Sequence, residues 1–274
     1  RKNWLQNWEK LMNQPIKKIK LNSQNLIPKK TIENLNIYVK KQKPEFKSHS
    51  KSKFQKGGTK YGNLYLNTFF KKRYQNYQKH ISKPDLSRRS CSRLSPYLAY
   101  GNISMRQIIQ RTELERKNGN NSFALKSFSS RLRWQSHFIQ KFEMECSMEF
   151  NSINKGYLTL KKPINKKYIK AWESGNTGVP IVDAAMRCLV QTGYLNFRMR
   201  SLVVSFFTHH LWQPWQACAH FLARQFLDFE PGIHYPQLQM QAGVTGINML
   251  RIYNPIKNGK EHDPNGHFVK KWIP

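Results

Sequence analysis

The stretch SGNTGVPIVDAAMRCLVQTGYLNFRMR, residues 174–200, predicts two consecutive core helices. Thr177 is placed to cap the first helix, Pro180 stands near its first position, and Asp183 lies in its first turn, where the helix dipole favours an acid. Apolar residues then recur at helical spacing, and Gly193 ends the run. The members of this stripe are Val182, Ala185, Met186, Leu189 and Val190.

A second helix is predicted to start near Asn196. Its apolar stripe consists of Met199, Leu202, Val203, Phe206 and Phe207. Arg198 and Arg200 stand at its beginning, beside a turn that the pattern predicts to be buried. The helical pattern alone does not explain two arginines at the hinge between two core helices.

The rest of the chain predicts an all-α domain at residues 54–274, preceded by a basic connector at residues 1–53. In the connector, Trp4, Leu5, Trp8 and Leu11 indicate one short helix, and the remainder is expected to be a linker. Helices are expected from about residue 92, over about 122–145 and over about 214–228, and a stripe of Leu64, Phe69, Phe70 and Tyr74 marks an earlier one. No run alternates as a strand does.

Composition favours a polyanionic partner. The chain has 274 residues, with 47 Lys and Arg against 15 Asp and Glu, which gives a net charge of +32. An AT-rich genome would raise Lys, but Asp and Glu are scarce, so we expect a nucleic-acid partner. The sequence shows no long basic amphipathic helix with an isolated apolar face, so we favour nucleic acid over an anionic membrane as the partner. The chain begins with Arg1 rather than Met, so we expect that an N-terminal part is absent.

The cysteines indicate reduced thiols of an intracellular, cytoplasmic protein. Cys91, Cys146, Cys188 and Cys218 are widely spaced and form no CxxC pair, so no metal site is expected. The adjacent pair His209–His210 lacks the spacing of a metal-binding helix. The longest apolar stretch, LVVSFF, is too short to span a bilayer, and no signal peptide is visible.

Two basic segments combine features of ligand sites with features of ordinary structure. Ser92, Arg93 and Ser95, at a predicted helix start, suit a phosphate, although serine-rich N-caps are common. On the long helix, Arg131, Trp134 and Phe138 share a face that suits stacking on bases, whereas a half-buried Trp with a snorkelling Arg is the plainer interpretation. Phe128, Leu132, Gln135 and Ile139 take the neighbouring face.

Residues 226–255 form the least ordinary segment. Asp228 and Glu230 are expected to end a helix, followed by a loop that holds Pro231, Gly232, His234 and Pro236. A mixed polar and apolar loop of this kind indicates a site. A lone histidine such as His234 is more often structural than catalytic.

Five segments together resemble the helical FAD-binding domain of the photolyase/cryptochrome family. They are CSRLSPYLAYGNIS, RLRWQSHF, AWESGNTGVPIVDAAMRCLVQTGYLNFRMR, FLDFEPG and RIYNPIKNGKEHDPNGHFVKKWIP, in the family's order over residues 54–274. The resemblance implies FAD as the cofactor. The matching segments do not include the family's N-terminal antenna domain, and we expect any antenna pigment to belong to that domain.

The resemblance also implies which residues bind FAD. Arg200 pairs with Asp228 beside the isoalloxazine ring, so that a fixed positive charge favours a reduced anionic flavin. Tyr77 and the run from Cys91 to Ser95 correspond to contacts with the phosphates and the ribityl chain. The full set expected to bind FAD is Tyr77, Cys91, Ser92, Arg93, Leu94, Ser95, Asn196, Arg200, Asp228, Phe229, Glu230 and His234.

The residues expected to face DNA depart from the family pattern. They are Arg131, Trp134, Phe138, Phe197, Arg198 and Met240. Arg198 and Trp134 resemble residues that line the cavity for a flipped lesion. Met240 replaces a lesion-packing tryptophan and Arg131 a glutamate, whereas Phe197 stands where many members have Asn.

The residues expected to carry electron transfer to the flavin also differ from the family pattern. Leu238 falls where the family has its flavin-proximal tryptophan, Trp215 matches the middle tryptophan, and His234 replaces an Asn near flavin N5. We therefore expect photoreduction to use Trp215 or Tyr235, with His234 as the acceptor of the tyrosine proton. The alternative is that Tyr235 only packs its loop and that the flavin is reduced chemically.

By this resemblance the chain is expected to be a monomeric, blue-light-driven, photolyase-like lyase that repairs pyrimidine dimers in DNA, single- or double-stranded. Two alternatives stay open. One is a cryptochrome-like photoreceptor without repair, and the other is a nucleic-acid-binding protein that keeps FAD as a structural core.

Overall fold

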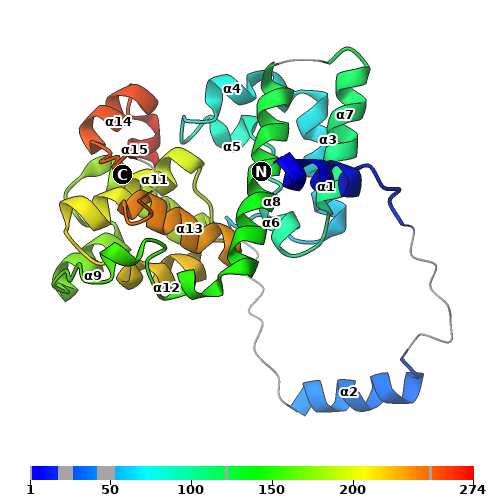
Figure 1. Ribbon diagram of the computed structural model, residues 1–274, viewed down its shortest axis with the longest axis horizontal. Coiled ribbons are helices and arrows are strands. Elements are labelled where there is room, and N and C mark those ends of the chain that lie inside the picture. Colours follow the sequence, from blue (N-terminus) through cyan, green and yellow to red (C-terminus); the bar gives the residue numbers. More distant parts are fainter. Residues whose placement is uncertain (1, 18–26, 42–52, 121–122, 247–248) are drawn as a thin grey trace. The chain divides into compact units, whose positions relative to one another are not determined.

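The computed structural model describes residues 2–17, 27–41, 53–120, 123–246 and 249–274 (Figure 1). The chain forms two compact units, Arg1–Lys53 and Phe54–Pro274. Helices and turns build both units, and the described residues contain no strand, which confirms the predicted all-α class. Within those same residues, no helix is long and apolar enough to cross a membrane.

The first unit contains one expected helix and one that the sequence did not predict. Helix α1, Lys2–Met12, carries Trp4 and Trp8, whose ring centroids lie 6.2 Å apart in a stacked pair. Helix α2, Lys29–Lys41, replaces part of the expected linker. Its described side chains, at residues 29–37, are all exposed, although Ile32, Leu35 and Val39 recur at helical spacing in the sequence. The linker predicted at 18–26 and 42–52 lies outside the described residues, and the connector role of this unit stays a prediction.

The second unit is a bundle of helices and short turns. Its helices are α3 (Thr59–Lys71), α4 (Tyr77–His80), α5 (Ser87–Ser90), α6 (Ser95–Ala99), α7 (Met105–Lys117), α8 (Phe123–Met144), α9 (Lys166–Ser174), α10 (Pro180–Thr192), α11 (Phe197–Ser205), α12 (Gln216–Gln225), α13 (Pro231–Ala242), α14 (Pro255–His262) and α15 (His267–Trp272). Three 3-10 turns, η2 (Arg73–Asn76), η3 (Cys146–Glu149) and η4 (Lys155–Tyr157), and a π-helix, η5 (Phe206–His210), join them.

Helices α10 and α11 lie at the centre of the core, as the stretch 174–200 predicted. Thr177 does not cap α10, because Val179 occupies that position. Instead the carboxylate of Asp183 accepts hydrogen bonds from the Thr177 hydroxyl and backbone N–H, at 2.6 and 2.8 Å, and from Gly178 N–H at 2.9 Å. Gly193 ends the helix in the left-handed conformation, where a Cβ would come within 2.5 Å of the Leu227 side chain.

Two members of the predicted stripes are exposed rather than buried. On α3 the buried face consists of Gly62, Leu66, Phe69 and Phe70, so Leu64 points away from it. On α10, Val190 lies on the outer side of a helix whose other faces are almost wholly buried. The helix expected from about residue 92 begins at Ser95 as the short helix α6, and α7 follows it. Arg93 has a φ of 58°, which turns the chain between α5 and α6.

The largest correction concerns residues 231–242, which form helix α13 rather than a loop. Helix α12 ends at Gln225, so Asp228 and Glu230 lie beyond it. Glu230 caps α13 by accepting a hydrogen bond from Gly232 N–H at 3.3 Å, and Pro231 takes the first helical position. Pro236 lies inside the helix, which is why the sequence argued against one.

Gly232 permits a close approach of α13 to α8. A Cβ at this position would lie 2.6 Å from Ile139 Cα, which is closer than side chains allow. The two helices therefore touch backbone to backbone at this point.

Candidate functional site

A cavity of about 190 Å³ brings many of the predicted FAD-binding residues together. Its wall is built from α4, the turn between α5 and α6, α8 and the turn between α10 and α11. The lining residues from the predicted sets are Tyr77, Cys91, Ser92, Arg93, Leu94, Ser95, Arg131, Asn196 and Phe197. The turn at Arg93 and the helix pair of residues 174–200, far apart in the chain, therefore form one site.

Arg93 is a buried cation without an anionic partner. No carboxylate of the described residues lies within ion-pair distance of it, and its Nε makes no hydrogen bond. Its guanidinium lies 3.7 Å from the centroid of the Tyr194 ring. Burial lowers the pKa of Arg93, while Tyr194 acts in the opposite direction. A buried guanidinium in this state is a ready partner for a phosphate oxygen.

Arg73, which the sequence analysis did not single out, holds the turn that carries these residues. Its guanidinium donates hydrogen bonds to the carbonyl oxygens of Cys91, of Ser92 at 3.3 Å and of Tyr65 at 2.5 Å. Burial raises the pKa of the Cys91 thiol to about 11, which keeps it protonated. No short sequence pattern could have revealed this contact, because the donor lies 18 residues before Cys91.

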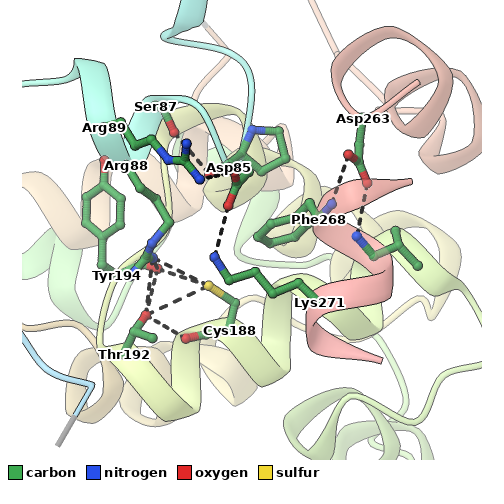
Figure 2. Close-up of polar contacts among 12 residues, drawn as sticks. Asp85, Ser87, Arg88, Arg89, Cys188, Thr192, Tyr194, Asp263, Phe268 and Lys271 are labelled. Carbon is green, nitrogen blue, oxygen red and sulfur yellow. Dashed lines mark hydrogen bonds and ion pairs between the residues drawn. The ribbon is translucent and has the colours of Figure 1, made fainter. Parts of the chain in front are cut away.

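A second network fastens α5 and the segment just before it to α15 and to the end of α10, as Figure 2 shows. Arg88 Nη1 donates to Thr192 Oγ1 and to the Tyr194 carbonyl oxygen, both at 3.4 Å. Asp85 accepts from Lys271 Nζ at 3.1 Å. These contacts fix α5 against the turn that carries Tyr194, so both walls of the cavity are tied to the core.

Arg200 and Asp228 form the ion pair that the resemblance implied. Arg200 Nη2 lies 3.0 and 2.9 Å from the two carboxylate oxygens, and Arg200 Nε donates to the Leu195 carbonyl oxygen at 2.8 Å. The Asp228 side chain is 7% exposed and that of Arg200 27%. The guanidinium also lies 4.1 Å from the Phe226 ring centroid. Neither residue of the pair lines the 190 Å³ cavity.

Tyr194 links the pair to the cavity and was missed by the sequence analysis. Its ring centroid lies 3.7 Å from the guanidinium of Arg93, 5.4 Å from that of Arg88 and 5.8 Å from that of Arg200. Burial raises the pKa of Tyr194 to about 12, so the phenol stays neutral. The cation on the cavity wall and the cation of the ion pair therefore share one neutral aromatic neighbour.

His234 is a buried, neutral histidine. Its Nε2 lies 2.9 Å from the Ala219 carbonyl oxygen, a contact that requires the proton on Nε2. Burial lowers its pKa to about 4, whereas this hydrogen bond acts in the opposite direction. Its ring meets those of Phe229, at 5.2 Å, and Tyr235, at 5.1 Å, edge to face.

The phenol of Tyr235 donates to Glu149 rather than to His234. The distance from Tyr235 Oη to Glu149 Oε1 is 2.9 Å, and the ring stacks on Phe142 with centroids 5.9 Å apart. Burial, followed by the hydrogen bond to Glu149, raises the pKa of Tyr235 to about 12. The predicted role of His234 as proton acceptor for Tyr235 is wrong, because Glu149 occupies that position.

Leu238 and Trp215 are both buried in the central core. Trp215 Nε1 lies 3.5 Å from Ser152 Oγ. Met240 is half-buried and does not line the cavity. The functions expected at these three positions stay predictions.

The predicted face of Arg131, Trp134 and Phe138 is divided. Arg131 lines the cavity with Phe128, Leu132 and Gln135, and its guanidinium lies 5.2 Å from the Phe197 ring centroid. Trp134 and Phe138 pack on each other outside the cavity, with centroids 5.7 Å apart. Arg131 thus belongs to the face that the pattern assigned to its neighbours.

The remaining predicted residues have structural partners. Asn196 caps α11 through Met199 N–H and donates to the Ile81 carbonyl oxygen at 3.1 Å. The Arg198 guanidinium lies 5.6 Å from the Tyr253 ring centroid, and its buried Nε makes no hydrogen bond. All four cysteines are free thiols. Over the described parts of the chain, no group of three or more His, Cys, Asp or Glu residues could hold a metal ion.

Comparisons with known proteins agree on one family. Residues 128–274, more than half of the chain, match the FAD binding domain of DNA photolyase. A deoxyribodipyrimidine photo-lyase of Vibrio cholerae is 33% identical over 213 residues, which cover 76% of this chain and 45% of that protein. Cryptochrome-1 of Arabidopsis thaliana is 32% identical over 227 residues, which cover 78% of this chain and 32% of that protein.

A solved structure has the same fold. A bacterial class III photolyase from Agrobacterium tumefaciens superposes with a TM-score of 0.75 at 27% identity, over 79% of this chain and 45% of that one. The chain spans less than half the length of each of these three relatives. The predicted resemblance is confirmed, and FAD is the cofactor of the matched domain. Since the match includes both members of the Arg200–Asp228 pair and covers most of the central core, this chain belongs to the family of the FAD binding domain of DNA photolyase.

Proposed function

We propose that this chain holds FAD between the Arg93 turn and the Arg200–Asp228 pair and that it acts in light-driven repair of pyrimidine dimers in DNA, as a photolyase-like lyase. The observation that carries the proposal is the buried Arg93 side chain, whose Nε has no hydrogen-bond partner and whose guanidinium lies near the same Tyr194 ring as the Arg200 member of the Arg200–Asp228 pair. An anionic phosphate at one end and a polar ring system at the other would complete this arrangement.

The residues fit the chemistry of FAD. Arg93, with the hydroxyl groups of Ser92 and Ser95 on the same wall, would hold the phosphates. The cavity of about 190 Å³ is smaller than the roughly 300–1,000 Å³ of common ligand pockets, so FAD requires side chains to move. Arg93 and Arg131 lie on aromatic rings at the cavity wall, and both side chains are long enough to swing.

When bound, reduced FAD supplies the blue-light absorber and the electron donor that splits the dimer. Arg200 contributes a fixed positive charge beside it, and Asp228 holds that guanidinium in place. The rings of Tyr194 and Phe226 lie beside the Arg200 guanidinium, with centroids 5.8 and 4.1 Å from it. Glu149 is placed to accept the Tyr235 proton if that tyrosine is oxidised.

Damaged DNA is the proposed partner because the chain carries a net charge of +32 and a cavity wall with two arginine side chains. A flipped dinucleotide would enter beside Arg131 and Phe197. The departures at Arg131, Leu238 and Met240 favour a second candidate, a cryptochrome-like photoreceptor without repair. The third candidate is a nucleic-acid-binding protein in which FAD is structural.

One experiment separates the three. The visible absorption spectrum of the purified protein is recorded before and after blue light, with and without an ultraviolet-damaged oligonucleotide, and loss of dimers is followed by the recovery of the oligonucleotide's ultraviolet absorbance. Flavin absorption with light-dependent loss of dimers supports repair, and a light-dependent flavin change without loss of dimers supports the photoreceptor. A flavin spectrum that light does not change supports the structural role. A colourless protein that cannot be reconstituted with FAD refutes the proposal.

A further inference from the structure

A second cavity, of about 510 Å³, lies apart from the flavin residues. Its walls are the segment before α9, the first turn of α9 and the turn that follows the π-helix η5. The lining residues that matter here are Ile164, Lys166, Lys167, Tyr168, Trp212 and Gln213. None of the residues that line the first cavity contributes to it.

Trp212 has a backbone conformation that disfavours its own side chain. Its φ is 54°, in the left-handed region that favours glycine or asparagine. Among the described residues, the only other non-glycine residue with positive φ is Arg93. Each of these two residues lines one of the two cavities. Strained residues of this kind cluster at functional sites.

Burial of the side chain does not explain why a tryptophan occupies this strained position, because 48% of Trp212 is exposed. The indole is nevertheless held in place. Lys162 Nζ donates to the Thr208 carbonyl oxygen at 2.6 Å and lies 4.1 Å from the indole ring centroid. Burial lowers the pKa of Lys162. An exposed aromatic ring is therefore presented at the cavity wall by a fixed support.

Gln213 joins the two walls of this cavity. It is buried, and its Oε1 accepts a hydrogen bond from Asn165 N–H at 2.8 Å, while its Nε2 donates to the Leu211 carbonyl oxygen at 2.8 Å. The start of α9 and the Trp212 turn thus keep a fixed spacing. Tyr168, half exposed on the first turns of α9, supplies a second aromatic side chain.

The charge around this cavity has one sign. Residues 155–170 contain six lysines and no Asp or Glu. Lys166 and Lys167 line the cavity and are exposed, and Lys155, Lys161 and Lys170 continue the exposed positive charge beyond it. Aromatic side chains on a groove with lysines along it are the features that bind single strands without sequence preference.

We propose that this second cavity binds single-stranded nucleic acid, with bases stacked on Trp212 and Tyr168 and phosphates paired with Lys166 and Lys167. A strand is favoured over a free nucleotide because the lysines extend past the cavity. It is favoured over a membrane because the exposed rings line a concave site rather than a protruding apolar face. The site requires neither FAD nor light.

The test measures the fluorescence anisotropy of a fluorescein-labelled oligothymidylate. Trp212→Gly is the central variant, since glycine suits the left-handed backbone and removes the stacking ring. We expect affinity to fall about tenfold, a change typical of losing one stacked base, while the melting temperature does not fall. Flavin content is expected to stay at the wild-type level, which separates this result from any failure of the flavin site.

Charge is tested with matched pairs. Lys166→Glu with Lys167→Glu should weaken binding and flatten its salt dependence, whereas Lys71→Glu with Lys72→Glu, two exposed lysines at the end of α3, should weaken it much less. Wild-type affinity in Trp212→Gly, or equal losses in the two lysine pairs, would overturn the proposal. So would competition by thymidine monophosphate at the same concentration of nucleotide, or binding to phosphatidylserine vesicles in place of the oligonucleotide.

Discussion

Acid should destabilise the protein through His234, and the variant His234→Asn should remove that part of the effect. The imidazole is 7% exposed and donates to the Ala219 carbonyl oxygen. Burial is the main reason that its pKa falls from 6.5 to about 4, while Arg200 and Asp228 act on it in opposite directions. Unfolding exposes the ring to water, where it takes up a proton near pH 6.5. The free energy of unfolding therefore falls as the pH drops from about 6.5 to about 4.

The size of the effect follows from those two pKa values. Between pH 7 and pH 5 the unfolded ring becomes almost fully protonated and the folded ring does not, so linkage gives a loss of about 2 kcal/mol. His80, His209 and His262 also have pKa values lowered by burial, and they add losses of the same sign. Their contribution remains in the variant, so the difference between the two proteins isolates His234.

The assay is urea unfolding of wild type and His234→Asn, each followed at pH 7 and at pH 5 with FAD present. Asparagine does not titrate, and its shorter side chain leaves the Ala219 carbonyl oxygen without this donor at both pH values, so that loss cancels in the comparison. We expect the loss on acidification to be about 2 kcal/mol smaller in the variant. The control is His220→Asn, an exposed histidine, which should keep the wild-type loss. Equal losses in wild type and His234→Asn would refute the assignment of a buried neutral imidazole.

Three further predictions concern the flavin and DNA. Asp228→Ala should strip FAD, because breaking a buried ion pair costs about 3–5 kcal/mol. The partial exposure of Arg200 puts this pair at the lower end of that range. Flavin content is measured as the ratio of flavin to protein absorbance, and full flavin content would contradict the prediction. Photoreduction with an external thiol should be slow in wild type, slower in Tyr235→Phe or Trp215→Phe, and faster in Leu238→Trp. A rapid wild type that Leu238→Trp does not accelerate would contradict the assigned positions. Binding to duplex DNA should weaken steeply with salt, and equal affinity at low and high salt would exclude phosphate contacts as its source.

The sequence predicted the fold well wherever a buried stripe coincided with a helix. The central helices α10 and α11, and the long helix α8, have continuous apolar faces and clear ends. Helix α13 escaped prediction because Pro236 and the Gly232 contact belong to its packing against α8, which no local pattern records. Helix α2 was overlooked although Ile32, Leu35 and Val39 recur at helical spacing in its sequence.

Two parts of the site could be predicted from the sequence, namely the Arg200–Asp228 ion pair and the turn at Arg93. Both lie in segments that resemble the family's motifs. Residues that act across long separations could not be predicted. Arg73 and Glu149 reach their partners from 18 and 86 residues away, and Tyr194 was overlooked although it stands inside the quoted stretch. The available signal for Tyr194 was its position directly after the helix-ending Gly193 and a few residues before Arg198 and Arg200.

The contact between Gly232 and Ile139 also sets the distance between helices α13 and α8. Helix α8 carries Arg131 on the cavity wall, and α13 carries Tyr235 two turns or fewer from the contact point. A methyl group at position 232 would act as a spacer that pushes the two helices apart by a fraction of an ångström. Since tunnelling rates fall steeply with separation, the proposed electron path through Tyr235 would respond to residue 232, a position outside the residues proposed to bind FAD.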